Sequence, residues 1–300
     1  MSTLRRVKKG LRDPRLAVDF LSYKTLKFLD KNLPIGSNVF ERDWDVLVVL
    51  DACRYDLFEA FAPKHDVYDS FESVTSYYSV ASSTKFWVRR TFDERFSNTI
   101  SKTHYVSGMG YADQLNSSRL QQLDHVWRYA ELPEAGSTRP EAVTDAGVQA
   151  IRNDEAERVI IHYAQPHAPF LHCLGRYNSK AGDGGNSQNV WNGLADGQYD
   201  TDEVWRDYGQ NLLRILDEVE VVIEEADGTV VVTSDHGNAM GEWGIYGHPG
   251  HIPLPTIRKV PWAEATGKAK RAYSIKGRDE FDSGRETSLH DHLKSLGYHD

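Results

Sequence analysis

The chain has 300 residues, of which 40% are hydrophobic and 26% charged, and this composition suffices for one large globular domain or two small ones. Its 35 Lys and Arg residues against 44 Asp and Glu give a net charge of -9, which argues against a general affinity for nucleic acid. Two cysteines cannot make a disulfide framework, and no apolar run approaches the roughly 20 residues that cross a bilayer. We therefore expect a cytoplasmic protein, with the inner membrane surface left open as a place of contact.

The N-terminal region is basic, because its first 31 residues carry nine Lys or Arg against three Asp. Apolar residues near a helical period predict an amphipathic helix over residues 16–31, which ends before Pro34 and Gly36. Two interpretations stay open: a helix that packs across the rest of the protein with its basic face in solvent, and one that docks on an anionic membrane surface or partner. We expect residues 1–37 to form this helix and a linker, and residues 38–300 to form a single catalytic domain.

Three apolar runs predict strands that are buried on both faces of a parallel sheet. They are Asp45–Asp51, Val159–His162 and Gly228–Ser234, and helical patterns such as Glu203–Glu218 lie between them. Strands that alternate with helices indicate an α/β fold, with a mainly parallel central sheet and helices on both faces. Residues 179–198 are rich in Gly, Asn, Asp and Ser, and predict a long surface loop near the site.

Each predicted strand ends in residues that bind metals or move protons. The first ends in Asp51, the second ends in His162 and runs on to His167, and the third leads into Asp235 and His236. In open α/β sheets, ligands bind outside the carboxyl ends of the strands. Two carboxylates and an imidazole at that edge suit a divalent ion, Zn or Mn more than Mg or Ca. We expect one tightly bound ion, with a second left open.

The segment Ser234–His248, SDHGNAMGEWGIYGH, closely resembles the SDHGE..GE.G..GH stretch of the alkaline phosphatase superfamily. The resemblance is strongest to the branch that holds sulfatase-like hydrolases and the phosphoethanolamine and phosphoglycerol transferases. Asp51 after its strand resembles the first metal ligand of that branch, and His167-Ala-Pro-Phe resembles its H.PF motif. Together these motifs cover residues 43–262 and imply the alkaline phosphatase/sulfatase-like fold.

The resemblance also implies roles for individual residues. It implies that Asp51, Asp235 and His236 bind a divalent metal together with a nucleophilic hydroxyl, whose pKa the metal lowers. The nucleophile should lie a few tens of residues after Asp51, at the N-terminus of a helix that can hold an anionic ester. Three consecutive hydroxyls fit this description, with Thr84 favoured over Ser83 and Ser82.

Two histidines are candidates for proton transfer or for holding a second metal, namely His167 and His248. Tyr163 stands where a two-metal phosphatase would carry a carboxylate, which favours one metal and leaves both histidines to the substrate. Further candidates for substrate binding are His162, Arg54 and Lys85. Each of these has an ordinary alternative, as a buried core histidine or as a member of an ion pair.

These residues predict a metal-dependent phosphatase, phosphodiesterase or phosphotransferase with a covalent Thr or Ser intermediate. Its substrate would be an anionic ester of a small molecule, a glycan or a lipid. One alternative is a sulfatase that works without formylglycine, since the chain has no C-x-P-S-R string and Cys53 follows Asp51 too closely. His248 argues against it, because sulfatases commonly have Lys at that position. The other alternative is a catalytically silent member of the fold that binds a glycan or a lipid headgroup.

Overall fold

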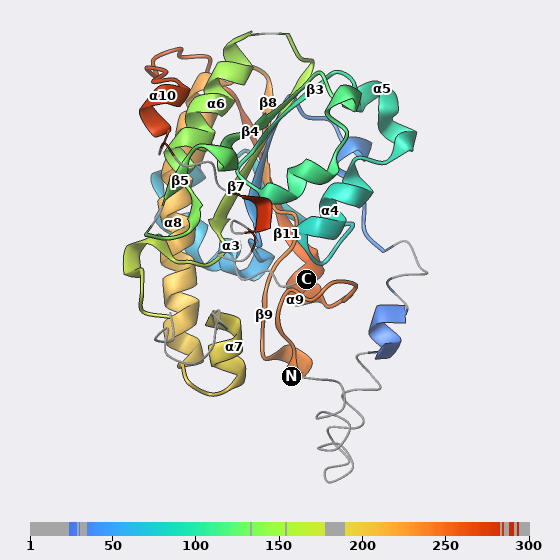
Figure 1. Ribbon diagram of the computed structural model, residues 1–300, viewed down its shortest axis with the longest axis vertical. Coiled ribbons are helices and arrows are strands. Elements are labelled where there is room, and N and C mark those ends of the chain that lie inside the picture. The colour runs from blue at the N-terminus through green and yellow to red at the C-terminus, as the bar shows by residue number, and fades with distance from the viewer. Residues whose placement is uncertain are drawn as a thin grey trace.

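The centre of the protein is a seven-stranded sheet with the strand order β2-β11-β8-β1-β7-β3-β4 (Figure 1). The computed structural model describes residues 24–28, 30, 35–132, 134–153, 155–177, 190–282, 284, 288–290 and 293. The strands of the sheet are β1 (Val46–Asp51), β2 (Ser73–Tyr78), β3 (Thr103–Ser107), β4 (Gln122–His125), β7 (Arg158–Pro166), β8 (Thr229–Thr233) and β11 (Lys259–Thr266). The strands from β8 to β4 are parallel, whereas β11 is antiparallel to both β8 and β2. This confirms the predicted α/β class and its mainly parallel sheet.

Helices cover both faces of the sheet (Figure 1). On one face lie α3 (Tyr55–Phe61), α6 (Pro140–Asn153) and α8 (Thr201–Glu225), and on the other lie α4 (Thr84–Thr91) and α5 (Ser97–Ile100). The shorter elements are α7 (Val190–Ala195), α9 (Pro255–Arg258), α10 (Arg278–Phe281), and the two-residue strands β5 (Glu131–Leu132), β6 (Ser137–Thr138), β9 (Ala239–Met240) and β10 (Tyr246–Gly247). Alternate residues of β1 enter two separate cores: Val48 and Leu50 pack on the α8 side, and Leu47 and Val49 on the α4 side. This double burial explains why β1 is apolar throughout.

The predicted loop over residues 179–198 is only partly described. Residues 178–189 lie outside the described residues, but residues 190–195 form the helix α7 rather than a loop. Val190, Trp191 and Leu194 are buried and join the core on the α8 side. Their apolar side chains explain the helix, because they give this short segment a face to bury.

Most of the predicted N-terminal helix lies outside the described residues, which include residues 24–28 and 30 of it in helical conformation. Asp30 is buried, and its carboxylate contacts Arg258, Arg90 and His251. This part of the segment therefore packs on the domain, while the domain boundary at residue 37 and the contact with a membrane stay predictions. Among the described residues, no helix is both long enough and apolar enough to span a bilayer.

Candidate metal and active site

The order of the central strands brings the predicted site residues to one edge of the sheet. Since β8, β1 and β7 are adjacent and parallel, their carboxyl ends lie side by side. Asp51 ends β1, Asp235 and His236 follow β8, and His167 follows β7. All four side chains are buried. The structure thus assembles one site from three separate parts of the sequence.

A sharp turn after β1 fixes the relative position of these strand ends. The register between β1 and β7 shifts at Asp51, and the backbone N–H of His167 donates to the carbonyl of Asp51 at 3.1 Å. Ala52 then adopts a left-handed conformation, with φ of 62°. Its N–H points back to the neighbouring strand and donates to Asp235 Oδ1 at 3.0 Å. The turn therefore holds one candidate metal-binding carboxylate against the segment that carries the other.

The three candidate nucleophiles have different surroundings. Thr84 is the first residue of α4, and its Oγ1 lies 3.2 Å from Asp51 Oδ1 and 3.1 Å from His236 Nε2. Ser82 Oγ instead donates to the carbonyl of Pro249 at 3.0 Å and accepts from the N–H of Ile252 at 3.1 Å. Ser83 is the N-cap residue of α4, without a side-chain hydrogen bond to the helix. Of the three hydroxyls, Thr84 is the one in contact with the candidate metal ligands.

The donor atoms around Thr84 have the spacing that a small cation requires. His236 Nε2 lies 3.4 Å from Asp51 Oδ1, 3.3 Å from Asp235 Oδ2 and 3.1 Å from Thr84 Oγ1. Ligand atoms about 3.3 Å apart form the edges of a tetrahedron whose metal–ligand bonds are about 2.0 Å long. His236 Nδ1 donates to the carbonyl of Gly237 at 3.0 Å, so the Nε2 lone pair faces the carboxylates. The residues therefore fit a divalent metal.

Two further histidines border this group. His167 Nε2 and His248 Nε2 are 3.1 Å apart, and the ring of His248 stacks on His236 with ring centroids 4.5 Å apart. Burial lowers the pKa of His167 to about 4, and burial together with the other imidazoles lowers the pKa of His248 well below its ordinary value. His167 Nδ1 donates to the carbonyl of Ala168 at 2.6 Å, so its Nε2 carries a lone pair. This arrangement can pass a proton or hold a second ion.

The candidate substrate-binding residues occupy three different environments. Arg54 is buried and forms ion pairs with Asp56 at 2.6 Å and with Glu242 at 2.8 Å. Lys85 is exposed on the first turn of α4. His162 is completely buried on β7, with its Nε2 3.9 Å from Asp235 Oδ2. The structure thus brings His162 close to the metal ligands and uses Arg54 to connect α3 with the turn after β9.

Sequence reasoning missed residues that orient the site from other elements. Asn211 of α8 donates from Nδ2 to the carbonyls of Pro166 and His167, at 3.0 and 3.3 Å. Tyr105 of β3 lies with its Oη 2.8 Å from His162 Nδ1. Asn211 could have been noticed in the sequence, because it is a polar residue next to Leu212 on the buried side of an amphipathic helix. Tyr105 had no such signal, because β3 itself was not predicted.

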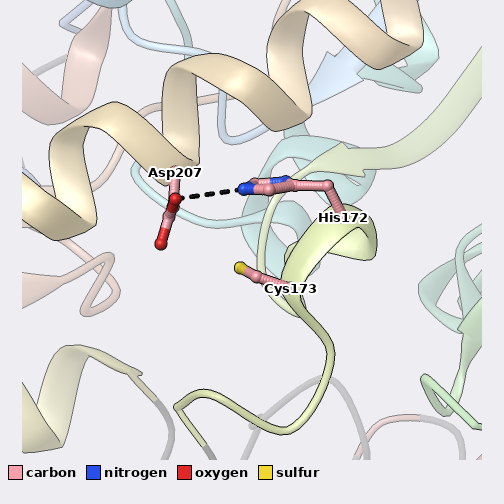
Figure 2. Close-up of side chains that lie close together, drawn as sticks. All are labelled: His172, Cys173 and Asp207. Atoms are coloured by element: carbon pink, nitrogen blue, oxygen red, sulfur yellow. Dashed lines mark hydrogen bonds and ion pairs between the residues drawn. The ribbon is translucent and has the colours of Figure 1, made fainter.

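A second group of side chains that often bind metals consists of His172, Cys173 and Asp207 (Figure 2). His172 Nε2 lies 3.1 Å from Asp207 Oδ1, while Asp207 Oδ2 accepts from Arg176 at 2.6 Å and from Tyr177 at 2.5 Å. Burial raises the pKa of the Cys173 thiol to about 11. With its carboxylate bonded to these donors and its thiol protonated, this group forms a polar network between the turn Leu171–Cys173 and α8.

The chain resembles known proteins in structure but not in sequence. No protein-family model matches the chain, and no curated protein matches it in sequence. The integral membrane protein lipooligosaccharide phosphoethanolamine transferase A (EptA) from Neisseria meningitidis is 14% identical, over 96% of this chain and 62% of that chain, with a TM-score of 0.50. The C-terminal periplasmic domain of the phosphoethanolamine transferase EptC from Campylobacter jejuni is 16% identical, over 75% and 79%, with a TM-score of 0.45. The 2-O GAG sulfatase BT1596 is 10% identical, over 86% and 72%, with a TM-score of 0.47.

The expectation of a cytoplasmic protein is wrong by this comparison. By their names, EptA is an integral membrane protein and the similar EptC domain is periplasmic. The sequence misled because the location was inferred from the number of cysteines and from apolar runs. Cys53 and Cys173 are both free in the structure, and two unpaired thiols carry no information about the redox state of a compartment.

The likeness to EptA extends over nearly the whole chain, although the chain spans less than two thirds of EptA. At 14% identity this likeness concerns the fold. It agrees with the resemblance inferred from the Asp235-His236 motif and from the H.PF motif at His167. The chain therefore shares its fold with the phosphoethanolamine transferase EptA.

Proposed function

We propose that the protein is a metal-dependent hydrolase or transferase of phosphoric esters that forms a covalent intermediate on Thr84. The observation that carries this proposal is the position of Thr84 Oγ1, 3.2 Å from Asp51 Oδ1 and 3.1 Å from His236 Nε2. A hydroxyl held among donors with the spacing of a tetrahedral site is placed to be both a metal ligand and a nucleophile. Two carboxylates and an imidazole favour Zn or Mn over Mg or Ca.

Asp51, Asp235, His236 and Thr84 would hold the ion. When bound, a divalent cation lowers the pKa of a coordinated hydroxyl and stabilises the negative charge of the transition state. Thr84 also begins α4, and the N-terminal end of a helix, with its first backbone N–H groups, favours an anion. These N–H groups would bind the non-bridging oxygens of the ester and orient its phosphorus toward Oγ1.

The reaction would proceed in two displacements. In the first, a bond forms between Thr84 Oγ1 and phosphorus while the bond to the leaving alcohol breaks. The pair of His167 and His248 would accept the proton that Thr84 loses and deliver it to the leaving oxygen. In the second, water or an acceptor alcohol loses a proton to the same pair and attacks phosphorus, and the released Thr84 oxygen takes up that proton. Hydrolysis and transfer therefore use the same residues and differ in the attacking oxygen.

The substrate class follows from the nucleophile and from the similar proteins. Threonine cannot become formylglycine, which favours a phosphoric over a sulfuric ester at Thr84. EptA and EptC are named as phosphoethanolamine transferases, and EptA acts on lipooligosaccharide by its name. We therefore extend the proposal to a phosphoric ester carried by a lipid, a glycan or a smaller molecule.

The test compares Thr84→Ala with Ser83→Ala, the neighbouring hydroxyl at the N-cap. Turnover of p-nitrophenyl phosphate and bis(p-nitrophenyl) phosphate is measured after incubation with Zn²⁺ or Mn²⁺, and the acid-quenched protein is analysed for phosphothreonine by mass spectrometry. We expect Thr84→Ala to lower kcat by a factor on the order of 10⁴ or more and to abolish the phosphorylated peptide. Ser83→Ala should stay within about tenfold of the wild type, since its hydroxyl takes no part in the displacement.

Two results would contradict the proposal. If Ser83→Ala loses turnover and Thr84→Ala retains it, the nucleophile is Ser83. If the wild-type chain binds neither Zn²⁺ nor Mn²⁺ and turns over neither ester, the protein is a silent binding member of the fold. Elemental mass spectrometry on the same samples gives the metal content per chain.

A further inference from the structure

The two oxygens of the Asp235 carboxylate have different partners. Oδ1 accepts hydrogen bonds from the backbone N–H of Ala52 at 3.0 Å and of His236 at 2.9 Å. Oδ2 is buried and has no hydrogen-bond donor among the described residues. It lies 3.3 Å from His236 Nε2, on the side of the proposed metal. The oxygen that would bind the metal is thus the one that the backbone does not hold.

The buried imidazole of His162, on β7, faces Asp235 Oδ2. His162 Nε2 lies 3.9 Å from Asp235 Oδ2 and, in the part of the chain that the structure describes, also has no hydrogen-bond partner. Both side chains are fully buried. A buried polar atom without a partner costs free energy, and here two such atoms of opposite character face each other. The gap exceeds a hydrogen bond, and a shift of about 1 Å by either side chain would close it.

The partner of the other ring nitrogen decides which atom carries the proton. Tyr105 Oη lies 2.8 Å from His162 Nδ1, and the two rings stack with centroids 6.1 Å apart. A lone pair on Nε2 aimed at a carboxylate would be repelled, so Nε2 carries the hydrogen. In the neutral ring Nδ1 is then an acceptor, and the hydroxyl of Tyr105 donates to it. Ser107 Oγ does not compete with His162 for the hydrogen of the Tyr105 hydroxyl. It lies 3.5 Å from Tyr105 Oη and itself donates to the carbonyl of Met109 at 3.0 Å.

We propose that Tyr105 and His162 are positioning residues that orient the ligand oxygen of Asp235, through a chain from the Tyr105 hydroxyl to His162 Nδ1 and from His162 Nε2–H to Asp235 Oδ2. This inference rests on the proposed metal-binding role of Asp235. Partners that fix a metal-binding carboxylate typically change metal affinity by about 10- to 100-fold. Neither Tyr105 nor His162 touches the metal or the substrate in this arrangement.

The experiment measures Zn²⁺ and Mn²⁺ affinity by competition with a chromogenic chelator, on the full chain. We expect Tyr105→Phe and His162→Phe to weaken binding by about 10- to 100-fold. His162→Gln should recover part of the loss, because its amide can donate where Nε2–H does. The matched control is Tyr77→Phe, which removes the hydroxyl of another buried tyrosine whose Oη has no hydrogen-bond partner among the described residues. Melting curves of the metal-free variants verify that each one folds.

Three outcomes are informative. Wild-type affinity in both Tyr105→Phe and His162→Phe overturns the inference while the proposed function stands. If the wild-type chain binds neither Zn²⁺ nor Mn²⁺, both this inference and the proposed function are overturned. The tautomer of His162 is tested separately in the metal-free protein by long-range ¹H–¹⁵N NMR, where a proton on Nδ1 instead of Nε2 overturns the chain of hydrogen bonds even if a variant fails to fold.

Discussion

Three neighbouring hydroxyl residues, Ser82, Ser83 and Thr84, do different work because the backbone turns into α4 between them. Ser82 faces the segment that follows His248 and bonds to Pro249 and Ile252. Thr84 faces the carboxyl edge of the sheet and contacts Asp51 and His236. Within two residues the chain thus passes from a hydroxyl that bonds to the backbone to one that contacts the candidate metal ligands.

Ser82→Ala should reduce stability without removing the site. The substitution leaves the buried N–H of Ile252 without its acceptor, which costs about 1–3 kcal/mol in the free energy of unfolding. Urea titration of the metal-free protein measures this, with Ser83→Ala as the control and a smaller expected change. An unchanged midpoint for Ser82→Ala would show that water replaces the hydroxyl.

Asp235→Asn should remove the metal while the chain stays folded. The amide oxygen still accepts from the N–H groups of Ala52 and His236, but the uncharged group is a poor ligand for a divalent ion. Elemental mass spectrometry should show the metal content fall from about one ion per chain to less than about a tenth. The control is Asp207→Asn, which alters the network of His172 and should leave the metal content unchanged. Retained metal in Asp235→Asn would contradict the ligand assignment.

At the scale of elements, one buried carboxylate joins four parts of the chain. Asp30 of the N-terminal segment contacts Arg258 at the end of α9, Arg90 of α4 at 3.2 Å, and His251 at 3.2 Å. Arg258 also donates to the backbone carbonyls of Ser79 and Ile35. Since Asp30 and Arg258 are almost fully buried, the N-terminal segment is part of the packing around α4.

Asp30→Ala should destabilise the protein strongly. It leaves the guanidinium of Arg258 buried without its carboxylate, and breaking a buried pair in this way costs about 3–5 kcal/mol. Deleting residues 1–31 removes the same carboxylate and should have a comparable effect, whereas deleting residues 1–23 keeps it. The control is Glu157→Ala, which breaks the exposed pair with Lys102 and should cost less than about 1 kcal/mol. Equal midpoints in urea for Asp30→Ala and Glu157→Ala would contradict this.

At the scale of the whole molecule, the fold disfavours the charged form of four imidazoles. Burial lowers the pKa of His162 and of His167 to about 4, and also lowers the pKa values of His236 and His248. In the unfolded chain these histidines titrate near pH 6.5. Between about pH 6.5 and pH 4 the unfolded state therefore binds more protons than the folded state.

The free energy of unfolding of the metal-free protein should fall as the pH falls through this range. His162 and His167 each change this free energy by at most about 1.4 kcal/mol per pH unit, and it falls because the unfolded state takes up the protons. Urea unfolding at pH 7.0 and pH 5.5, both in chelator, measures the effect. A stability that is constant between these values would show that the imidazoles take up as many protons in the folded state as in the unfolded chain.

The sequence by itself determined β1 and β8, the first part of β7, and the predicted metal ligands Asp51, Asp235 and His236; β7 was expected to end at His162 but continues to Pro166. These features are local, since a strand buried on both faces is apolar throughout and its ligands follow directly in the chain. The strands β2, β3 and β4 were not predicted; β2 and β4 are partly exposed and rich in polar residues, so neither forms a continuous apolar run. Without β3, neither Tyr105 nor its contact with His162 could be inferred.

Only the tertiary structure decided what depends on contacts between distant residues. Thr84 is distinguished from Ser82 and Ser83 by Asp51 and His236, which lie 33 and 152 residues away from it in the chain. The pairing of His167 with His248 and the burial of Asp30 against Arg258 likewise arise where separate elements meet. A side chain's type and its neighbours in sequence are local information, whereas its burial and hydrogen-bond partners are set by packing.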